Sequence, residues 1–339
     1  MNSIKLLHTG DLHLGSPMQN MGDRAKERKA ELLDTLTNIV NLAIEEEVDA
    51  VLIAGDLFDT NKPDARTADR VYAELSRLGD TKVFAVLGNH DYCADFTFPP
   101  NVYLFDDYIE KIPFKDADIY GVSFGANHCE QCIIEGLVAD DDDRINLLLV
   151  HGDVGADGVY NPISADCIKH SKMDYIALGH QHTYTEEQIG GTTVAYCGIS
   201  EGRAFDECGE KGVIIATIGK GYADCRFVPV AKRQYVALTV DITGAQDNIE
   251  IAERVTKELG NRENAYCVIL KGEKSTFVDS EFIKDYIEKD YYYAEIEDMT
   301  EEAKDEGYTL KNLFMEKCKN ENALKYGLSA LRGEKVEIV

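Results

Sequence analysis

Apolar runs alternate with amphipathic stretches over the first part of the chain. The runs are typical of parallel strands buried on both faces of a sheet, and they cover residues 4–9, 50–54 and 82–87. The stretches between them, residues 24–47 and 63–78, carry apolar residues at helical spacing, and Pro63 is suited to a first helical turn. This order of strands and helices predicts a parallel sheet with right-handed crossovers.

Shorter apolar runs continue the pattern through the middle of the chain. We expect strands at residues 102–105, 119–122, 145–150, 173–178, 192–197, 212–218 and 224–230. The last three look like antiparallel strands that complete a second sheet. Two such sheets, flanked by helices in a sandwich, would bring the ends of the main strands to one edge.

The pattern restarts near Tyr235, in a region without any recognisable chemical motif. Strands are expected at residues 236–242, 265–270 and 291–297, and helices at 247–259, 280–288 and 310–319. We therefore expect two domains, residues 1–233 and residues 234–339, the second being a small α+β unit. Residues 310–331 contain two short amphipathic helices that could dock a partner, although packing on their own domain is favoured.

The composition is that of a globular protein. Of the 339 residues, 44% are hydrophobic and 29% are charged, and no apolar run reaches the roughly 18 residues that span a bilayer. The N-terminus lacks the length of a signal peptide, and the nine scattered cysteines fit reduced thiols, so a cytoplasmic location without membrane contact is expected. The net charge of −27 argues against a broad basic surface for nucleic acid, and it means that carboxylates alone do not mark a site.

Side chains that could carry chemistry stand at the ends of the predicted strands. They are Asp11, His13, Asp56, Asn89, His151, His180 and His182. Five of the eight histidines belong to these strand-end motifs when His90, beside Asn89, is counted. Histidine and carboxylate together are ligands for borderline divalent metals such as Mn, Fe, Zn or Ni. Seven ligands exceed one tetrahedral site and fit two ions about 3.5–4 Å apart, bridged by Asp56 on its central strand.

A pair of ions at this edge would bind a phosphoryl group and lower the pKa of a shared water towards about 7, which provides a nucleophile for in-line attack. The leaving oxygen then needs a proton. His90 would point into the cleft and is the predicted general acid, with Asp59 holding its tautomer. A single strand-end histidine is usually structural, but five metal-capable motifs together favour a metal site.

The motifs also follow the order of a known superfamily. The chain resembles the calcineurin-like metallophosphoesterases over Asp11-x-His13, Gly55-Asp56-x-x-Asp59, Gly88-Asn89-His90-Asp91, His151 and Gly179-His180-x-His182. Neighbouring residues, among them Gly202-Arg203-Ala204-Phe205-Asp206-Glu207, resemble the SbcD-type DNA repair exonucleases over residues 1 to about 230. The last hundred residues resemble the capping domain of that family only in position and rough pattern.

This resemblance implies a four-layer αββα sandwich with a small C-terminal α+β capping domain. It also implies a manganese-dependent phosphodiesterase that acts on DNA ends, partnered by an SMC-like ATPase of the SbcC type. By the same resemblance, one ion would be held by Asp11, His13, Asp56 and His182, and the other by Asp56, Asn89, His151 and His180. His90 and Asp59 would be the catalytic pair.

Two alternatives stay open at this point. The acidity slightly favours a phosphatase or phosphodiesterase for a nucleotide or another small phosphoester, whereas DNA contact would need a small patch or a partner. A non-catalytic subunit with a structural site is the other, although the complete ligand set argues against it. The sequence also leaves open whether a homodimer forms and whether Arg203 lies near the phosphate or braces the sheet. His8 is expected to be buried or to support a ligand.

Overall fold

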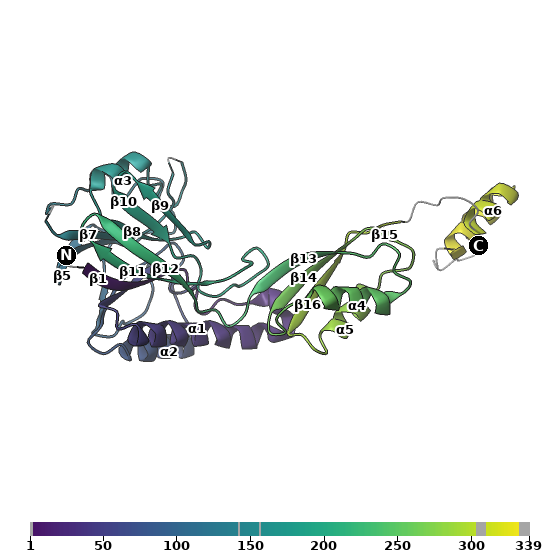
Figure 1. The fold of residues 1–339 in the computed structure, drawn as a ribbon, viewed down its shortest axis with the longest axis horizontal. Coiled ribbons are helices and arrows are strands. Elements are labelled where there is room, and N and C mark those ends of the chain that lie inside the picture. Colours follow the sequence, from purple (N-terminus) through teal and green to yellow (C-terminus); the bar gives the residue numbers. More distant parts are fainter. Residues whose placement is uncertain (1–2, 142, 156, 303–309, 332–339) are drawn as a thin grey trace. The chain divides into compact units, whose positions relative to one another are not determined.

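The structure is a computed structural model that describes residues 3–141, 143–155, 157–302 and 310–331. These residues form two compact units, which are drawn in Figure 1. The first unit runs to Ala237 and includes Glu263–Ala265, and the second consists of Leu238–Arg262 and the residues from Tyr266 onwards. All the candidate site residues lie in the first unit.

Two six-stranded sheets form the centre of the first unit. In spatial order, the first sheet contains β12 (Tyr222–Pro229), β11 (Gly212–Gly219), β1 (Ser3–Thr9), β2 (Ala50–Ala54), β3 (Lys82–Val86) and β4 (Val102–Leu104). The second contains β5 (Glu110–Phe114), β6 (Ala117–Val122), β7 (Ile145–His151), β8 (Tyr175–Gly179), β10 (Thr192–Tyr196) and β9 (Thr185–Ile189). The predicted parallel pairing of β1, β2 and β3 is confirmed.

The expectation that residues 192–197, 212–218 and 224–230 complete the second sheet as antiparallel strands is wrong. β10 belongs to that sheet but pairs parallel with β8, because β9 reverses the chain just before it. β9 is mostly exposed and polar, so no apolar run in the sequence marks it. β11 and β12 lie in the first sheet instead, where β11 pairs antiparallel with β1.

The apolar runs are continuous because each main strand is covered on both faces. In β7, Leu147 and Leu149 face the core between the sheets, whereas Leu148 and Val150 face the core on the outer side of the second sheet. Helices α1 (Ala25–Glu45) and α2 (Ala65–Ser76) cover the outer face of the first sheet, and α3 (Ala165–Ser171) covers that of the second (Figure 1). The unit is therefore a four-layer αββα sandwich.

The helix ends follow local capping chemistry. α2 begins at Ala65, because the side chain of Asp64 accepts a hydrogen bond from the backbone N–H of Thr67 at 3.0 Å and caps the helix. Pro63 therefore precedes the helix, and the expectation that it lies in the first turn is wrong. The short 3-10 helix η1 (Gln19–Arg24) precedes α1, and α3 is too short for its periodicity to be recognised.

The second unit is a small α+β structure. Its main sheet has the order β13 (Tyr235–Asp241), β14 (Ala265–Lys271) and β16 (Tyr293–Asp298). Helices α4 (Asn248–Glu258) and α5 (Ser280–Ile287) bury Ile251, Val255, Ile283 and Ile287. The remaining elements are the paired short strands β15 (Glu273–Lys274) and β17 (Glu301–Glu302), and helices α6 (Leu310–Lys317) and α7 (Glu321–Leu331). Nowhere in the described residues does a helix have the length and apolar character needed to cross a bilayer.

Candidate metal centre

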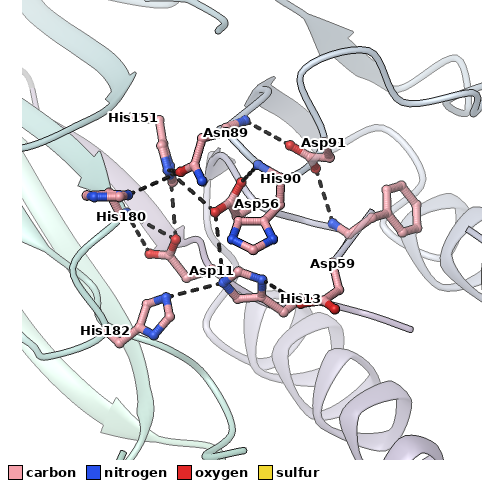
Figure 2. Close-up of polar contacts among 12 residues, drawn as sticks. Asp11, His13, Asp56, Asp59, Asn89, His90, Asp91, His151, His180 and His182 are labelled. Carbon is pink, nitrogen blue, oxygen red and sulfur yellow. Dashed lines mark hydrogen bonds and ion pairs between the residues drawn. The ribbon is translucent and has the colours of Figure 1, made fainter. Parts of the chain in front are cut away.

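The carboxyl ends of five parallel strands meet at one edge of the sandwich, and the predicted side chains converge there (Figure 2). The first sheet contributes four of them and the second sheet three: Asp11, His13, Asp56 and Asn89, then His151, His180 and His182. The loops that follow β1 and β2 are joined by backbone hydrogen bonds of 3.0 Å, from Asp11 N–H to Gly55 and from His13 N–H to Asp56. Strand ends far apart in the sequence are thereby brought to a common centre.

The backbone at this edge is strained. Four of the candidate ligands, Asp11, His13, Asp56 and His180, have φ values of 49°, 44°, 48° and 101°. Residues with side chains rarely adopt this left-handed region, and clusters of them are typical of functional sites. Gly55 (φ 90°) directly follows β2. A Cβ at this residue would lie only 2.5 Å from His151 Nδ1, so the close approach of the two sheets requires glycine.

One group of side chains gathers around two facing imidazoles. The Nε2 atoms of His13 and His182 lie 3.2 Å apart, and Asp11 offers an oxygen within 4.8 Å of both rings' ligand atoms. The Nδ1 atom of His182 lies 2.8 Å from Glu207 Oε1. If the proton of His182 is on Nδ1 and is donated to this carboxylate, the lone pair on Nε2 faces the ring of His13.

A second group lies on the other side of the centre. The oxygen of Asn89 lies 3.0 Å from His151 Nε2 and 3.2 Å from His180 Nδ1. His151 donates from Nδ1 to the carbonyl of Ala54 at 2.9 Å, which directs its Nε2 into the site. The Nε2 of His180 lies 3.3 Å from Asp153 Oδ2, which directs the opposite nitrogen towards Asn89.

Asp56 lies between the two groups. Its Oδ2 atom is 3.9 Å from His13 Nε2 and 3.5 Å from His151 Nε2, and its Oδ1 accepts a hydrogen bond of 2.9 Å from the backbone N–H of His90. One oxygen therefore faces an imidazole from each group, as Figure 2 shows. This is the placement expected of a carboxylate that bridges two ions.

The electrostatics of the centre fit divalent cations. Burial, together with the charge of Asp56, raises the pKa of Asp11 well above its usual value. Burial lowers the pKa of His13 and of His151, which favours the neutral form of imidazole that binds metals. Burial also opposes the charge on Asp56, but His151 and His13 outweigh it and lower the pKa of that carboxyl. A cation stabilises closely spaced buried carboxylates and imidazoles, because its positive charge offsets the repulsion between Asp11 and Asp56.

His90 is exposed and lies beside this centre. Its ring meets that of His13 edge to face, with the ring centroids 4.7 Å apart. The predicted pairing of His90 with Asp59 is not formed: Asp59 Oδ1 lies 3.2 Å from His13 Nδ1 and 3.2 Å from an Arg203 nitrogen. The orientation of the His13 contact falls short of a hydrogen bond. The guanidinium of Arg203 is the charged partner of Asp59 instead.

Sequence reasoning assigned no role to several residues that support the centre. Asp91 is fully buried and accepts backbone hydrogen bonds from Gly88 at 2.8 Å and Phe58 at 3.1 Å, which joins the two loops that carry Asn89 and Asp56. Burial raises the pKa of Asp91 to about 7. Asp153 and Glu207 contact His180 and His182. Glu207 stands inside a recognised motif and Asp153 lies two residues after His151, but side chains that support a ligand have no spacing rule of their own.

The contacts of two further residues show where their side chains lie. His8 is buried, as expected, with Nδ1 2.9 Å from the Tyr175 hydroxyl and Nε2 3.2 Å from the carbonyl of Leu178. Arg203 lies at the site and donates to Glu207 at 2.7 Å as well as to Asp59. Burial raises the pKa of the Glu207 carboxyl, but the hydrogen bonds from His182 and Arg203 outweigh this and lower it to about 2.

An αββα sandwich with carboxylates and imidazoles gathered at its strand ends defines a metallophosphoesterase. The calcineurin-like phosphoesterase family model matches residues 4–184, more than half of the chain, and the chain belongs to this family. Its members act through two metal ions, so the protein is a metal-dependent hydrolase of phosphoesters.

Relatives with similar sequences include proteins named for DNA repair. The uncharacterized metallophosphoesterase YhaO of Bacillus subtilis is 26% identical over 80% of this chain and 72% of its own length. The DNA double-strand break repair protein Mre11 of Haloferax volcanii is 26% identical over 80% of this chain, which spans 62% of that protein. The SbcD component of the nuclease SbcCD from Bacillus subtilis is 37% identical, over 26% of this chain and 22% of its own length.

Proposed function

We propose that the protein is a two-metal phosphodiesterase of the SbcD type that cuts DNA in end processing and repair. The observation that carries the proposal is the position of Asp56, whose Oδ2 faces His13 at 3.9 Å on one side and His151 at 3.5 Å on the other. The relatives named Mre11 and nuclease SbcCD support DNA as the substrate class.

The proposed ligand sets are those that the family resemblance implies, and the two groups of side chains support them. Asp11, His13, Asp56 and His182 would hold one ion, and Asp56, Asn89, His151 and His180 the other. Manganese is the proposed metal, because carboxylate, amide and imidazole ligands suit it. The bound ions would supply positive charge to the phosphoryl oxygens and an activated water for in-line attack.

The remaining steps fall to side chains around the ions. His90 donates the proton that the leaving oxygen needs, since its ring is exposed while its backbone N–H is fixed on Asp56 Oδ1. Asp91 keeps the loops of His90 and Asp56 in register through its bonds to Gly88 and Phe58. Asp59 contacts His13 and Arg203 and is proposed to fix the orientation of both side chains. It would affect the reaction only through them.

The domain roles and partners belong to the same proposal. Residues 1–233 would be the nuclease domain and residues 234–339 the capping domain. An SbcC-type ATPase is the proposed partner, because the similar protein from Bacillus subtilis is a component of a nuclease named SbcCD. The net charge of −27 makes such a partner the natural source of additional DNA contacts.

A specific observation favours a second candidate, a phosphodiesterase or phosphatase for a small phosphoester. A cavity of about 500 Å³ is lined by Phe124, which packs edge-on against His151 with ring centroids 5.4 Å apart. Asp106, Asp107 and Glu110 also line it. Such an acidic lining repels a DNA backbone, with its many phosphates, more strongly than a small ester with one phosphoryl group. The carboxylates would accept hydrogen bonds from hydroxyl or amino groups of such an ester.

One set of assays separates the two. Manganese-loaded protein should hydrolyse bis-p-nitrophenyl phosphate and should degrade end-labelled duplex DNA faster, per mole, than it turns over cyclic dinucleotides or phosphomonoesters. Asp56→Asn should abolish both activities, whereas Asp140→Asn, a change at an exposed carboxylate of the same unit, should leave them unchanged. Faster turnover of small esters with DNA left intact would favour the second candidate, and inertness on every phosphoester would refute both.

A further inference from the structure

A single guanidinium lies between two carboxylates that each face one imidazole of the first group. Arg203 donates to Glu207 Oε1 at 2.7 Å and to Asp59 Oδ1 at 3.2 Å. Glu207 Oε1 in turn lies 2.8 Å from His182 Nδ1, and Asp59 Oδ1 lies 3.2 Å from His13 Nδ1. The chain of contacts therefore runs from one facing imidazole to the other, around the back of the site.

We propose that Arg203, Glu207 and Asp59 are positioning residues for one of the two ions, and that the other ion does not depend on them. The inference rests on the proposed two-metal centre and adds that the ions are held by separate supporting networks. Residues behind a ligand histidine fix its tautomer and ring orientation, and their loss typically weakens metal binding by about 10–100-fold.

The network sets which nitrogens can bind a cation. His182 Nδ1 lies 2.8 Å from Glu207 Oε1 and 3.4 Å from an Arg203 nitrogen. Because the carboxylate is the closer partner and can only accept, the proton of His182 is favoured on Nδ1 and the lone pair on Nε2. A lone pair on His13 Nδ1 would face the carboxylate oxygen of Asp59, so the proton of that ring is favoured on Nδ1 as well. Both lone pairs then lie on the Nε2 atoms, which are 3.2 Å apart and cannot hydrogen-bond to each other. A shared cation is the partner that satisfies both.

The supporting loop is itself anchored, which gives the network rigidity. The backbone N–H of Arg203 donates to Glu207 Oε2 at 2.7 Å, and the side chain of Asn20 donates to the carbonyl of Arg203 at 2.9 Å. Two residues earlier in the chain, Glu201 accepts from the fully buried Arg28 at 2.7 Å. The side chain of Glu207 is only 8% exposed, so its contact with His182 is shielded from water.

The second group of ligands is oriented by different residues. His151 is hydrogen-bonded to the backbone carbonyl of Ala54, and His180 Nε2 faces the carboxylate of Asp153 at 3.3 Å. The carboxylate of Asp153 also accepts a hydrogen bond of 3.3 Å from Gln181. Asp153 thus faces His180 as Glu207 faces His182, across a longer and more exposed contact, and the two carboxylates can be compared by experiment.

The test measures manganese binding to chelator-stripped protein by calorimetry, with electron paramagnetic resonance to distinguish a coupled ion pair from an isolated ion. Wild-type protein should bind two ions and show the coupled spectrum. Glu207→Gln and Arg203→Ala should each weaken one ion by about 10–100-fold and give the isolated-ion spectrum at low manganese. Arg203→Lys should be intermediate, because lysine keeps the charge but not the planar fork of donors.

Control variants identify the ion and exclude a general loss of structure. Arg226→Ala, which removes an exposed arginine paired with Glu46, should change neither ion. Asp153→Asn should also weaken one ion, and the double variant Asp153→Asn/Glu207→Gln should weaken both. Adding Arg203→Ala to Glu207→Gln should cost little more than Glu207→Gln alone, because the two residues belong to one network.

Three outcomes would overturn the inference. Glu207→Gln could leave both ions at wild-type affinity, or weaken both equally, or lower only the melting temperature, and each would mean that the network merely braces the loop. Because glutamine matches glutamate in size, Glu207→Gln is informative even where Arg203→Ala fails to fold. Failure of the wild-type protein to bind two manganese ions is a different result, which would refute the proposed function and this inference together.

Discussion

His13 and His182 stand 169 residues apart in the sequence, yet their Nε2 atoms face each other at 3.2 Å. Glu207 lies on the Nδ1 side of His182, so the Nε2 atom of that ring presents a lone pair towards His13. The fold thus holds two metal-capable ring nitrogens next to each other. A cation between such groups therefore stabilises the folded state as well as binding substrate.

The first prediction concerns metal removal. Stripping divalent ions with a chelator should lower the melting temperature of the protein, and returning manganese should restore it. At an ion concentration 100 times the dissociation constant, the stabilisation is about 2.7 kcal/mol per site. Differential scanning calorimetry measures the shift, with potassium chloride as an ionic-strength control. Equal melting temperatures with and without manganese would contradict a metal site at this edge.

The second prediction separates chemistry from metal binding at His90. In His90→Gln the backbone N–H still reaches Asp56, so both ions should bind with wild-type affinity. The proton donor is lost, and kcat for phosphodiester hydrolysis should fall by about 10²–10⁴-fold. For a substrate whose leaving group needs no proton, the variant should show a much smaller loss of kcat. Release of metal from this variant would show that His90 is a ligand and not the acid.

The third prediction uses the tight contact between Gly88 and the bridging carboxylate. A Cβ at residue 88 would lie 2.3 Å from Asp56 Oδ1 and 2.8 Å from the Asp56 backbone nitrogen, so Gly88→Ala must displace Asp56. We expect weaker binding of both ions, loss of hydrolysis and a stability loss of roughly 1–3 kcal/mol.

Gly191→Ala is the matched control for this change, because a Cβ there meets nothing within 4 Å. Calorimetric titration with manganese and thermal unfolding should leave Gly191→Ala at wild-type values. Unchanged manganese affinity in Gly88→Ala would show that Asp56 can shift without consequence, and would count against its bridging position.

The positions of the candidate ligands were accessible from sequence because parallel strands share one edge. Every residue of β2 and β7 is buried, and each strand ends at or just before its metal-capable residue. Once two sheets are packed face to face, the residues at these strand ends lie at the same edge of the sandwich. The family resemblance then supplied the division of the ligands between two ions, which the strand pattern alone did not contain.

Contacts between loops were not accessible in the same way. Asp59 lies 144 residues from Arg203 in the sequence, and nothing in either motif indicates that Asp59 pairs with this guanidinium and not with His90. The missed strand β9 has a similar cause. Its polar side chains are exposed at a sheet edge, so its place depends on hydrogen bonding to β10 and leaves no hydrophobic pattern.

The last prediction concerns the pH dependence of stability and rests on His8, which lies outside the candidate ligand set. Burial lowers the pKa of His8 from 6.5 to about 3, although the hydrogen bond to Leu178 opposes this. Between these pH values the unfolded chain binds a proton at this position and the folded chain does not. Stability should therefore fall as the pH drops from 6.5 towards 3, by on the order of 4 kcal/mol from this residue.

The comparison of wild type with His8→Gln isolates this contribution, because every other titrating group is present in both proteins. Denaturant unfolding is measured in chelator at a series of pH values, so that metal release does not add to the slope. Wild type should lose stability on acidification more steeply than the variant, and the difference between the two should shrink as the pH falls. Parallel curves would mean that His8 takes up its proton equally in the folded and unfolded states. That result would contradict the lowered pKa of this buried ring, which has Tyr175 and Leu178 as its hydrogen-bond partners.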